Sequence, residues 1–145
     1  LAAYWTYRQD VVVIDAGTAI TVDFVTNAGL HLGGYIVSGI TGLGQAIKSS
    51  TGLYFERSTV NFSDSIPNNT NDALLSGGWM MLSGFFSKIE ETIARDKIYQ
   101  SWGNELKWVL TGGDHKKVGA CLRPTFLVNT QLVLDGALIV SKNST

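Results

Sequence analysis

Three strand-like segments early in the chain are separated by connections too short for parallel pairing. We expect them at 11–15, 19–26 and 30–37, and Asn27-Ala28-Gly29 is typical of a tight reversal between the last two. A parallel pair of strands needs a crossover of roughly a dozen or more residues. The sequence therefore predicts an antiparallel meander. Gly33-Gly34, inside the third strand, predicts a bulge or a close approach by another backbone or a ligand.

After the meander, helical and strand-like segments alternate. Helices are expected at about 41–49, 70–97, 114–122 and 130–141, strands at 106–111 and 125–128, and a long polar loop at 50–68. Strands separated by helices are typical of parallel pairing. The predicted fold class is therefore α/β, with the three-stranded antiparallel meander extended by parallel strands and helices on both faces of the sheet.

Two packing expectations follow from the helical segments. Before the first strand, Trp5 is expected to pack inward together with Ala2 and Ala3. In the long helix, Gly77 and Gly84 are seven residues apart and share a face, where another helix or strand would pack closely. Core packing and a subunit interface both remain open for that face.

Composition limits the kind of protein that this chain belongs to. Its 145 residues suffice for one compact domain, and its hydrophobic fraction of 45% is that of an ordinary globular domain. A net charge of −1 gives no general attraction to nucleic acid or acidic membranes. The single Cys121 excludes an internal disulfide and argues for a reducing, cytoplasmic setting without a structural zinc site.

No targeting or membrane-spanning segment is expected. The chain start lacks a basic region followed by a sustained apolar one, and it also lacks an initiator methionine, so we expect a fragment or a processed chain. The most apolar later run, Ala73 to Phe86, contains three glycines. It is shorter than the ~20 apolar residues that span a bilayer, so it is interpreted as a buried helix.

The turn after the first strand carries the first candidate site. Asp15, Gly17 and Thr18 follow a buried apolar run. A glycine lets backbone N–H groups approach an anion, a hydroxyl donates a hydrogen bond, and a carboxylate holds a cation or its water shell. This combination suits phosphate or cation binding. The alternative is a hairpin in which Asp15 and Thr18 only satisfy local hydrogen bonds.

Two further motifs are weak when taken alone. In 109–113 a strand runs directly into Gly112-Gly113 and then into a helix capped by Asp114, which opens space at a strand end and points helix N–H groups at a ligand. The same pattern is also a simple way to form a turn. Thr70, after Asn69, begins the long helix as an N-cap or binds the polar end of a substrate.

Together these motifs resemble the second domain of the superfamily that unites actin, sugar kinases and heat-shock ATPases, a ribonuclease H-like fold. Within it, the chain most closely resembles the type III pantothenate kinases, which include relatives named Bvg accessory factors. The matching segments are DAGTAITVD at 15–23, HLGGYI followed by SG at 31–39, NT at 69–70, LTGGD at 110–114 and LVLDGAL at 132–138.

The resemblance implies a role for each matching position. Asp15 takes the place of a ligand of a monovalent cation, potassium or ammonium. Gly17 and Thr18 take the place of ATP-phosphate contacts, and Thr70 that of a pantothenate contact. Gly112 and Gly113 match glycines on the adenosine side. His31, Asp23, Lys116 and Lys117 are assigned instead to solvated surfaces.

The implied enzyme transfers phosphate from ATP to pantothenate, giving 4′-phosphopantothenate in the first step of coenzyme A biosynthesis. The resemblance implies ATP, magnesium and potassium as cofactors, and a homodimer whose interface borders the substrate site. It also implies that residues 1–145 form a single ATPase-type domain, the second of a two-domain kinase. The absent first domain would supply the other phosphate loop, and the general base would lie just before Leu1, so the isolated chain is expected to be inactive.

One departure from the family pattern and two alternatives remain. Ser38 stands where the family usually has a proline, which predicts a looser loop before Gly39. The first alternative is a non-catalytic transcriptional accessory protein on the same fold. The second is a kinase of the same superfamily that acts on another small molecule.

Overall fold

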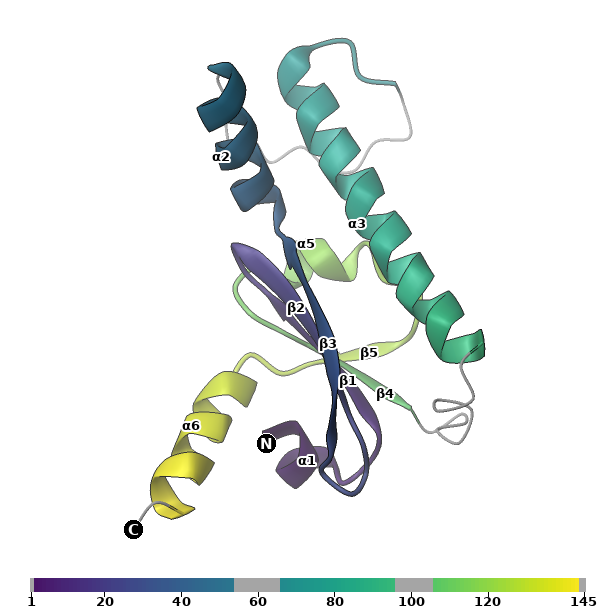
Figure 1. The fold of residues 1–145 in the computed structure, drawn as a ribbon, viewed down its shortest axis with the longest axis vertical. Coiled ribbons are helices and arrows are strands. Elements are labelled where there is room, and N and C mark those ends of the chain that lie inside the picture. Colours follow the sequence, from purple (N-terminus) through teal and green to yellow (C-terminus); the bar gives the residue numbers. More distant parts are fainter. Residues whose placement is uncertain (1, 54–65, 96–105, 144–145) are drawn as a thin grey trace.

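The computed structural model describes residues 2–53, 66–95 and 106–143 (Figure 1). Its elements, in chain order, are α1 (Ala2–Tyr7), β1 (Val11–Ala16), β2 (Ala19–Val25), β3 (His31–Ser38), α2 (Ile40–Thr51), α3 (Thr70–Arg95), β4 (Lys107–Thr111), α5 (His115–Gly119), β5 (Phe126–Val128) and α6 (Leu132–Asn143). This order and the mixed α/β class confirm the prediction from the sequence. No helix in the described ranges is long and apolar enough to cross a membrane.

The five strands form one sheet in the order β3-β2-β1-β4-β5. β1 pairs with β2, and β2 with β3, in antiparallel fashion, which confirms the meander. β4 pairs with β1, and β5 with β4, in parallel. The expected irregularity in β3 is also present, because the register against β2 shifts between Phe24 and Val25 and Gly33 has a φ of 115°. The sheet is thus a meander extended by parallel strands, as predicted.

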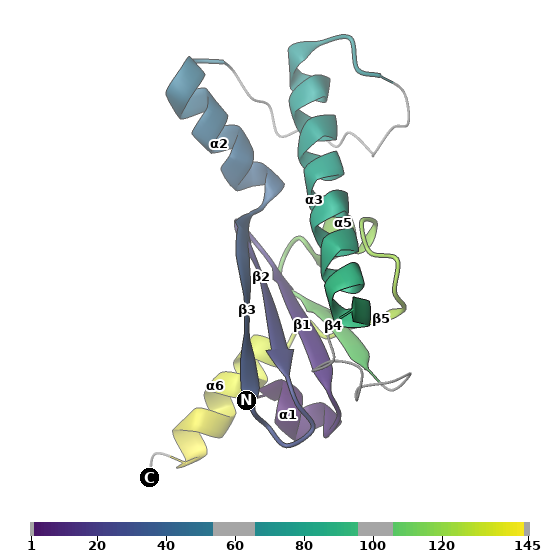
Figure 2. The ribbon, with the colours of Figure 1, turned by 45° about the vertical axis from the view of Figure 1, so that its right-hand side comes forward.

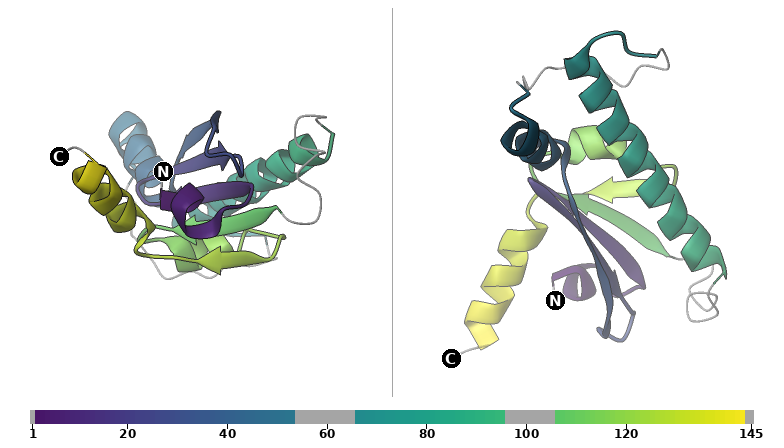
Figure 3. Two further views of the ribbon diagram at one scale, coloured as in Figure 1. Left: turned by 90° about the horizontal axis from the view of Figure 1, so that it is seen from below. Right: turned by 45° about the horizontal axis from the view of Figure 1, so that its top comes forward.

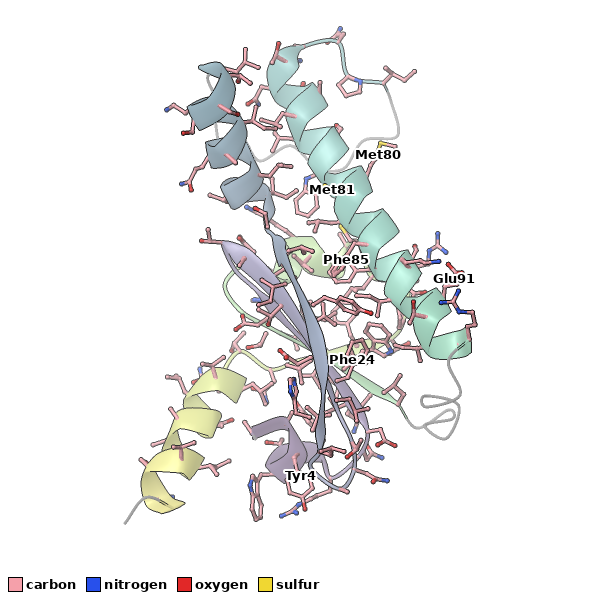
Figure 4. The ribbon with its side chains drawn as sticks, viewed as in Figure 1. Tyr4, Phe24, Met80, Met81, Phe85 and Glu91 are labelled. Carbon is pink, nitrogen blue, oxygen red and sulfur yellow. The ribbon has the colours of Figure 1, made fainter. Side chains whose placement is uncertain are left out.

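The long helix α3 covers one face of the sheet (Figure 2). The main core lies between them, because Ile14 of β1 and Val22 of β2 alternate toward α3, where Leu82 and Phe86 meet them fully buried. Phe24 and Phe85 also point into this space, and the ring of Tyr35 bridges them at centroid distances of 6.0 and 6.1 Å (Figure 4). Burial of these apolar side chains anchors α3 to the sheet.

Helices α1 and α6 lie on the opposite face (Figure 3). Ala2 and Ala3 are buried there beside Val11 and Leu132, which confirms two of the inward positions expected before β1. The expectation for Trp5 is wrong. Its side chain is 48% exposed, and the Arg8 guanidinium lies 4.1 Å from the centre of its ring. A cation over an aromatic face stabilises a half-exposed indole at the surface.

Helix α2 extends away from the sheet and lies beside the first half of α3 (Figure 1). The two helices approach closely at Gly78, where an added Cβ would come within 2.8 Å of Ile40 and 3.1 Å of Leu43. For Gly77 and Gly84, close packing against another element is wrong within the described chain, and the subunit-interface alternative stays a prediction. A Cβ at either position would meet nothing within 4 Å. Both glycines face open space, because α2 packs on the neighbouring face.

Two helix ends differ from the sequence-based boundaries. Helix α2 continues to Thr51 and ends where Gly52 adopts a left-handed φ of 72°. Most of the loop expected at 50–68 lies outside the described residues. Helix α5 is shorter than the expected 114–122 and ends at Gly119, where an added Cβ would come within 2.9 Å of the Phe126 ring. This close packing of β5 requires a glycine, which favours the end of the helix.

Candidate functional site

Two turns at the carboxyl ends of adjacent parallel strands lie in contact. The first joins β1 to β2 at Gly17-Thr18, and the second joins β4 to α5 at 112–114. The Asp114 N–H donates a 2.8 Å hydrogen bond to the Ala16 carbonyl, which links the two turns directly. Ligands of α/β folds usually bind at such strand ends, so we take this pair of turns as the candidate site.

Gly112 allows the two turns to meet. Its φ of 88° is in the left-handed region, and an added Cβ would lie 2.4 Å from the Ala16 carbonyl oxygen and 2.5 Å from the Asp15 carboxylate. An L side chain is strained in this conformation and finds no space here. Gly112 is thus required for the close contact between the two turns, in addition to the ligand contact that the resemblance implies.

The junction between β3 and α2 supports the first turn from its other side. The Gly39 N–H donates a 2.8 Å hydrogen bond to the Thr18 carbonyl, and a Cβ on Gly39 would lie 2.4 Å from the Gly17 carbonyl oxygen. Ser38 closes the same junction, because its hydroxyl donates a 3.0 Å hydrogen bond to the Gly39 carbonyl. This contact of Gly39 was not predicted, since nothing in the local sequence shows which turn Gly39 will contact.

Packing within the described residues does not require a glycine at two positions of the site. A Cβ on Gly113 would meet nothing within 4 Å, and one on Gly17 only the Ala19 carbonyl oxygen at 3.5 Å, an ordinary contact. Neither has a positive φ. Thr18, in the first turn beside the β3–α2 junction, is exposed. The Gly17 N–H donates a 3.0 Å hydrogen bond to the Ala19 carbonyl, so this donor is used within the turn. The surface of the site is therefore uncrowded at Gly17 and Gly113 and carries the exposed Thr18 hydroxyl, so an anionic group can approach it closely.

The first N–H groups of α5 are used within the chain. The Asp114 N–H binds the Ala16 carbonyl, and the His115 N–H binds the Gly112 carbonyl at 3.3 Å. The Asp114 side chain occupies the N-cap position but makes no capping hydrogen bond, and Lys117 lies 3.8 Å from it. The expectation that this helix start directs its N–H groups at a ligand is wrong for these two groups.

Asp15 lies next to the second turn, on the face of the sheet opposite α3. It is half-buried and pairs in register with Thr111 of β4 on one side and Thr21 of β2 on the other. Within the described residues its carboxylate makes no hydrogen bond or ion pair. The same part of the chain contains no group of three or more His, Cys, Asp or Glu side chains placed to hold a metal ion. Asp15 is thus one carboxylate flanked by hydroxyls.

Thr70 lies apart from these turns. It is the first residue of α3, whose beginning stands beyond the sheet beside α2 (Figure 1). The N-cap of α3 is Asn69, because the Asp72 N–H donates a 3.0 Å hydrogen bond to the Asn69 side-chain oxygen, and the Asn69 amide donates to the Asp72 carboxylate at 2.6 Å. The N-cap interpretation of Thr70 is therefore wrong, and its exposed hydroxyl has no capping duty.

The residues assigned to solvated surfaces are at the surface. His31 begins β3 with its side chain 58% exposed, and its Nε2 lies 2.8 Å from the Asp23 carboxylate. Lys116 and Lys117 are exposed on α5. The His31–Asp23 pair lies at the edge strand, away from the second turn.

Cys121 is half-buried and packs against the main core. Burial raises the pKa of its thiol, and a hydrogen bond with Ser83 partly opposes that rise. A raised pKa leaves little thiolate at neutral pH, and the thiolate is the reactive form. We expect iodoacetamide to label Cys121 more slowly in the native than in the urea-unfolded protein, with the native rate still rising at mildly alkaline pH. Equal labelling rates, measured by mass spectrometry of the Cys121 peptide, would contradict this.

Comparisons with known proteins agree on one family. A family model described as type III pantothenate kinase matches residues 1–95. A type III pantothenate kinase from Marinomonas sp. (strain MWYL1) is 38% identical over 115 residues, which cover 79% of this chain and 43% of that relative. Another, from Nitrosomonas eutropha, is 29% identical over 143 residues, covering 99% of this chain and 54% of that relative. The chain thus spans about half the length of the curated relatives it matches.

A solved structure is also similar over almost the whole chain. It is that of a protein from Campylobacter jejuni assigned to the Baf family of transcriptional activators. The TM-score is 0.62 at 27% sequence identity, over 99% of this chain and 62% of that one. The fold, the family model and the sequence relatives therefore converge: the chain belongs to the type III pantothenate kinase family.

Proposed function

We propose that this chain is the ATP-side half of a type III pantothenate kinase, the second domain of a two-domain, actin-like (ribonuclease H-like) fold. The complete enzyme transfers the γ-phosphoryl group of ATP to the terminal hydroxyl of pantothenate, the first step toward coenzyme A. The preceding domain supplies the second phosphate loop and the general base. Phosphoryl transfer depends mostly on positioning and charge stabilisation, so a domain that binds phosphates on one side performs half of that task.

The observation that carries the proposal is the open backbone at Gly17 and Gly113. Both glycines tolerate a Cβ within this chain, yet both border the joined turns at the carboxyl ends of β1 and β4. Backbone that the described residues leave uncovered gives a ligand room to approach. In this proposal ATP phosphates lie against Gly17 and Thr18, and the adenosine side lies against Gly112-Gly113.

A monovalent cation, potassium or ammonium, accompanies the nucleotide in this proposal. Asp15 fits such an ion, because its carboxylate makes no ion pair in the described chain and Thr111, its register partner, has a buried hydroxyl without a hydrogen-bond partner. The bound cation supplies positive charge that offsets the negative charge of the phosphates. Magnesium enters with ATP. Asp15 thus holds a cation and does not transfer a proton.

On the substrate side, the proposal includes a pantothenate contact at Thr70 and a homodimer. It places the enzyme in the cytoplasm. Thr70 would contact pantothenate from a position apart from the two turns. The exposed side of α3 supports a homodimer, because Met80 and Met81 are 67% and 48% exposed there and Met80 points away from α2 (Figure 4). Apolar side chains at the surface are typical of interfaces.

A product assay tests the proposed reaction. Full-length protein is incubated with ATP, magnesium and potassium, together with pantothenate or, separately, with a sugar or a sugar acid. The proposal predicts a phosphorylated product only from pantothenate, detected by mass spectrometry. Phosphorylation of a sugar but not of pantothenate would favour another kinase of the superfamily.

The Campylobacter jejuni relative favours a second candidate, a transcriptional accessory protein without kinase activity. Such a regulator need bind neither ATP nor pantothenate. Calorimetric titration of the full-length protein with each compound separates the two functions. Binding of both supports the kinase, and binding of neither supports the regulator.

A further inference from the structure

Three oxygen-bearing side chains form one row across the sheet at the candidate site. Asp15 of β1 is paired in register with Thr21 of β2 and with Thr111 of β4. Adjacent strands lie about 5 Å apart, so the two threonines flank Asp15 at neighbour distance. All three share a face, because the residues next to them, such as Ile14, Ile20 and Leu110, belong to the core on the α3 side.

The Thr111 hydroxyl has an unusual environment. Thr111 is only 1% exposed, and its Oγ1 has no hydrogen-bond partner in the described structure. A buried hydroxyl is normally hydrogen-bonded, because leaving it without a partner costs the free energy of its lost hydration. A valine has nearly the same shape and would avoid this cost. The hydroxyl next to Asp15 is therefore accounted for if it binds a group other than the described residues.

The Thr21 hydroxyl complements this arrangement. Its proton is donated to the Asp23 carboxylate over 3.3 Å, and the His31 ring lies 2.8 Å from the other oxygen of that carboxylate. Because the Thr21 proton is used in the hydrogen bond to Asp23, only the lone pairs of the Thr21 oxygen remain to face Asp15. The row thus presents one carboxylate and two hydroxyl oxygens. It runs from fully buried at Thr111 to half-buried at Asp15 and Thr21.

We propose that the hydroxyl oxygens of Thr21 and Thr111 bind the monovalent cation directly, together with the Asp15 carboxylate. This inference rests on the proposed function for the presence of the cation at Asp15, and it extends that site to two further strands. Oxygen ligands suit hard cations, and a single carboxylate balances a single positive charge. The cation would join β2, β1 and β4 at the strand ends where the two turns meet.

The test replaces each hydroxyl by a methyl group in the full-length enzyme. The variants are Thr21→Val and Thr111→Val, with Thr92→Val on the outer part of α3 as the control for the same chemical change. The unfolding temperature is measured in potassium chloride and in choline chloride at equal ionic strength, with a non-hydrolysable ATP analogue present. The potassium concentration for half-maximal turnover provides the second readout.

For both row variants we expect the potassium-dependent rise in unfolding temperature to shrink and the half-saturating potassium concentration to increase by about tenfold. Thr92→Val should respond to potassium like the wild type. In choline chloride, Thr111→Val should unfold at the wild-type temperature or above it, because the partnerless hydroxyl has been removed. A purely structural role for the threonines would not change the response to potassium.

Serine and alanine variants keep the test decisive if a valine variant does not fold. Thr111→Ser and Thr111→Ala differ only by the oxygen, and only the serine variant should keep the potassium response. Folded valine variants that respond like the wild type, or a wild type without any response to potassium, would overturn the inference. If the row variants lose the response in an enzyme that does not phosphorylate pantothenate, the proposed substrate is wrong and the cation row still stands.

Discussion

Replacement of Asp15 by Asn in the full-length enzyme is expected to lower turnover of ATP and pantothenate by about a hundredfold. Asn has the size of Asp and removes only the negative charge. Asp15 is the one charged member of the row with Thr21 and Thr111, so its neutralisation removes the electrostatic attraction for the cation. A higher potassium concentration should restore part of the lost rate, because mass action offsets weaker binding.

Asp10→Asn is the matched control. Asp10 precedes the same strand at its opposite end, where its carboxylate accepts a 2.7 Å hydrogen bond from the Asn27 N–H. An asparagine keeps the side-chain oxygen that accepts this bond, so turnover should stay near that of the wild type. Initial rates at several potassium concentrations compare the three proteins. A wild-type rate and potassium dependence in Asp15→Asn would contradict the cation assignment.

Replacement of Gly112 by Ala is expected to lower the free energy of unfolding by about 3 kcal/mol, the sum of backbone strain and overpacking. The φ of 88° is unfavourable for alanine, and its Cβ would lie 2.4 Å from the Ala16 carbonyl oxygen. That oxygen belongs to backbone and accepts the hydrogen bond that joins the two turns, so it cannot move cheaply. Denaturant unfolding of the full-length protein measures the change.

Gly113→Ala is the comparison one residue away. A Cβ at Gly113 meets nothing within 4 Å, and its φ is not positive, so stability should stay within about 0.5 kcal/mol of the wild type. The proposed ATP site adds a second expectation, weaker ATP binding, because the methyl group occupies open surface next to the nucleotide. If Gly112→Ala unfolds at the same denaturant concentration as the wild type, the claim that the contact between the turns leaves no space for a side chain at Gly112 is contradicted.

The meander was predictable because its signals are local. A continuous apolar run defines β1 and alternating apolar residues define β2, and connections of a few residues leave only antiparallel pairing for β1 to β3. Helix contacts were less predictable. Gly77, Gly78 and Gly84 lie on one helix, and the sequence does not show which of them faces α2. Glycine spacing pointed to Gly77 and Gly84, whereas the contact within the described chain is that of Gly78 with Ile40 and Leu43, which depends on the tertiary position of α2.

The candidate site was predictable in part. The motif around Asp15, Gly17 and Thr18 was visible because its residue types carry their own chemistry. The row of Thr21, Asp15 and Thr111 was not, since the register of β1 against the distant strand β4 arises only when the two segments pair. The N-cap of α3 shows a similar limit, because adjacent Asn69 and Thr70 are both good caps and only the observed hydrogen bond decides between them.

The most direct measurement of the central claim is the affinity of the full-length protein for ATP when the Thr18 hydroxyl is removed. Thr18→Ala deletes the exposed hydroxyl in the first turn, beside the β3–α2 junction. Thr125→Ala removes an exposed hydroxyl just before β5, at the opposite end of the sheet. In calorimetric titration with magnesium and potassium present, we predict about tenfold weaker ATP binding for Thr18→Ala, the equivalent of a hydrogen bond to a charged group. Thr125→Ala should bind like the wild type. Equal ATP affinity in all three proteins would contradict the claim that these turns bind the phosphates.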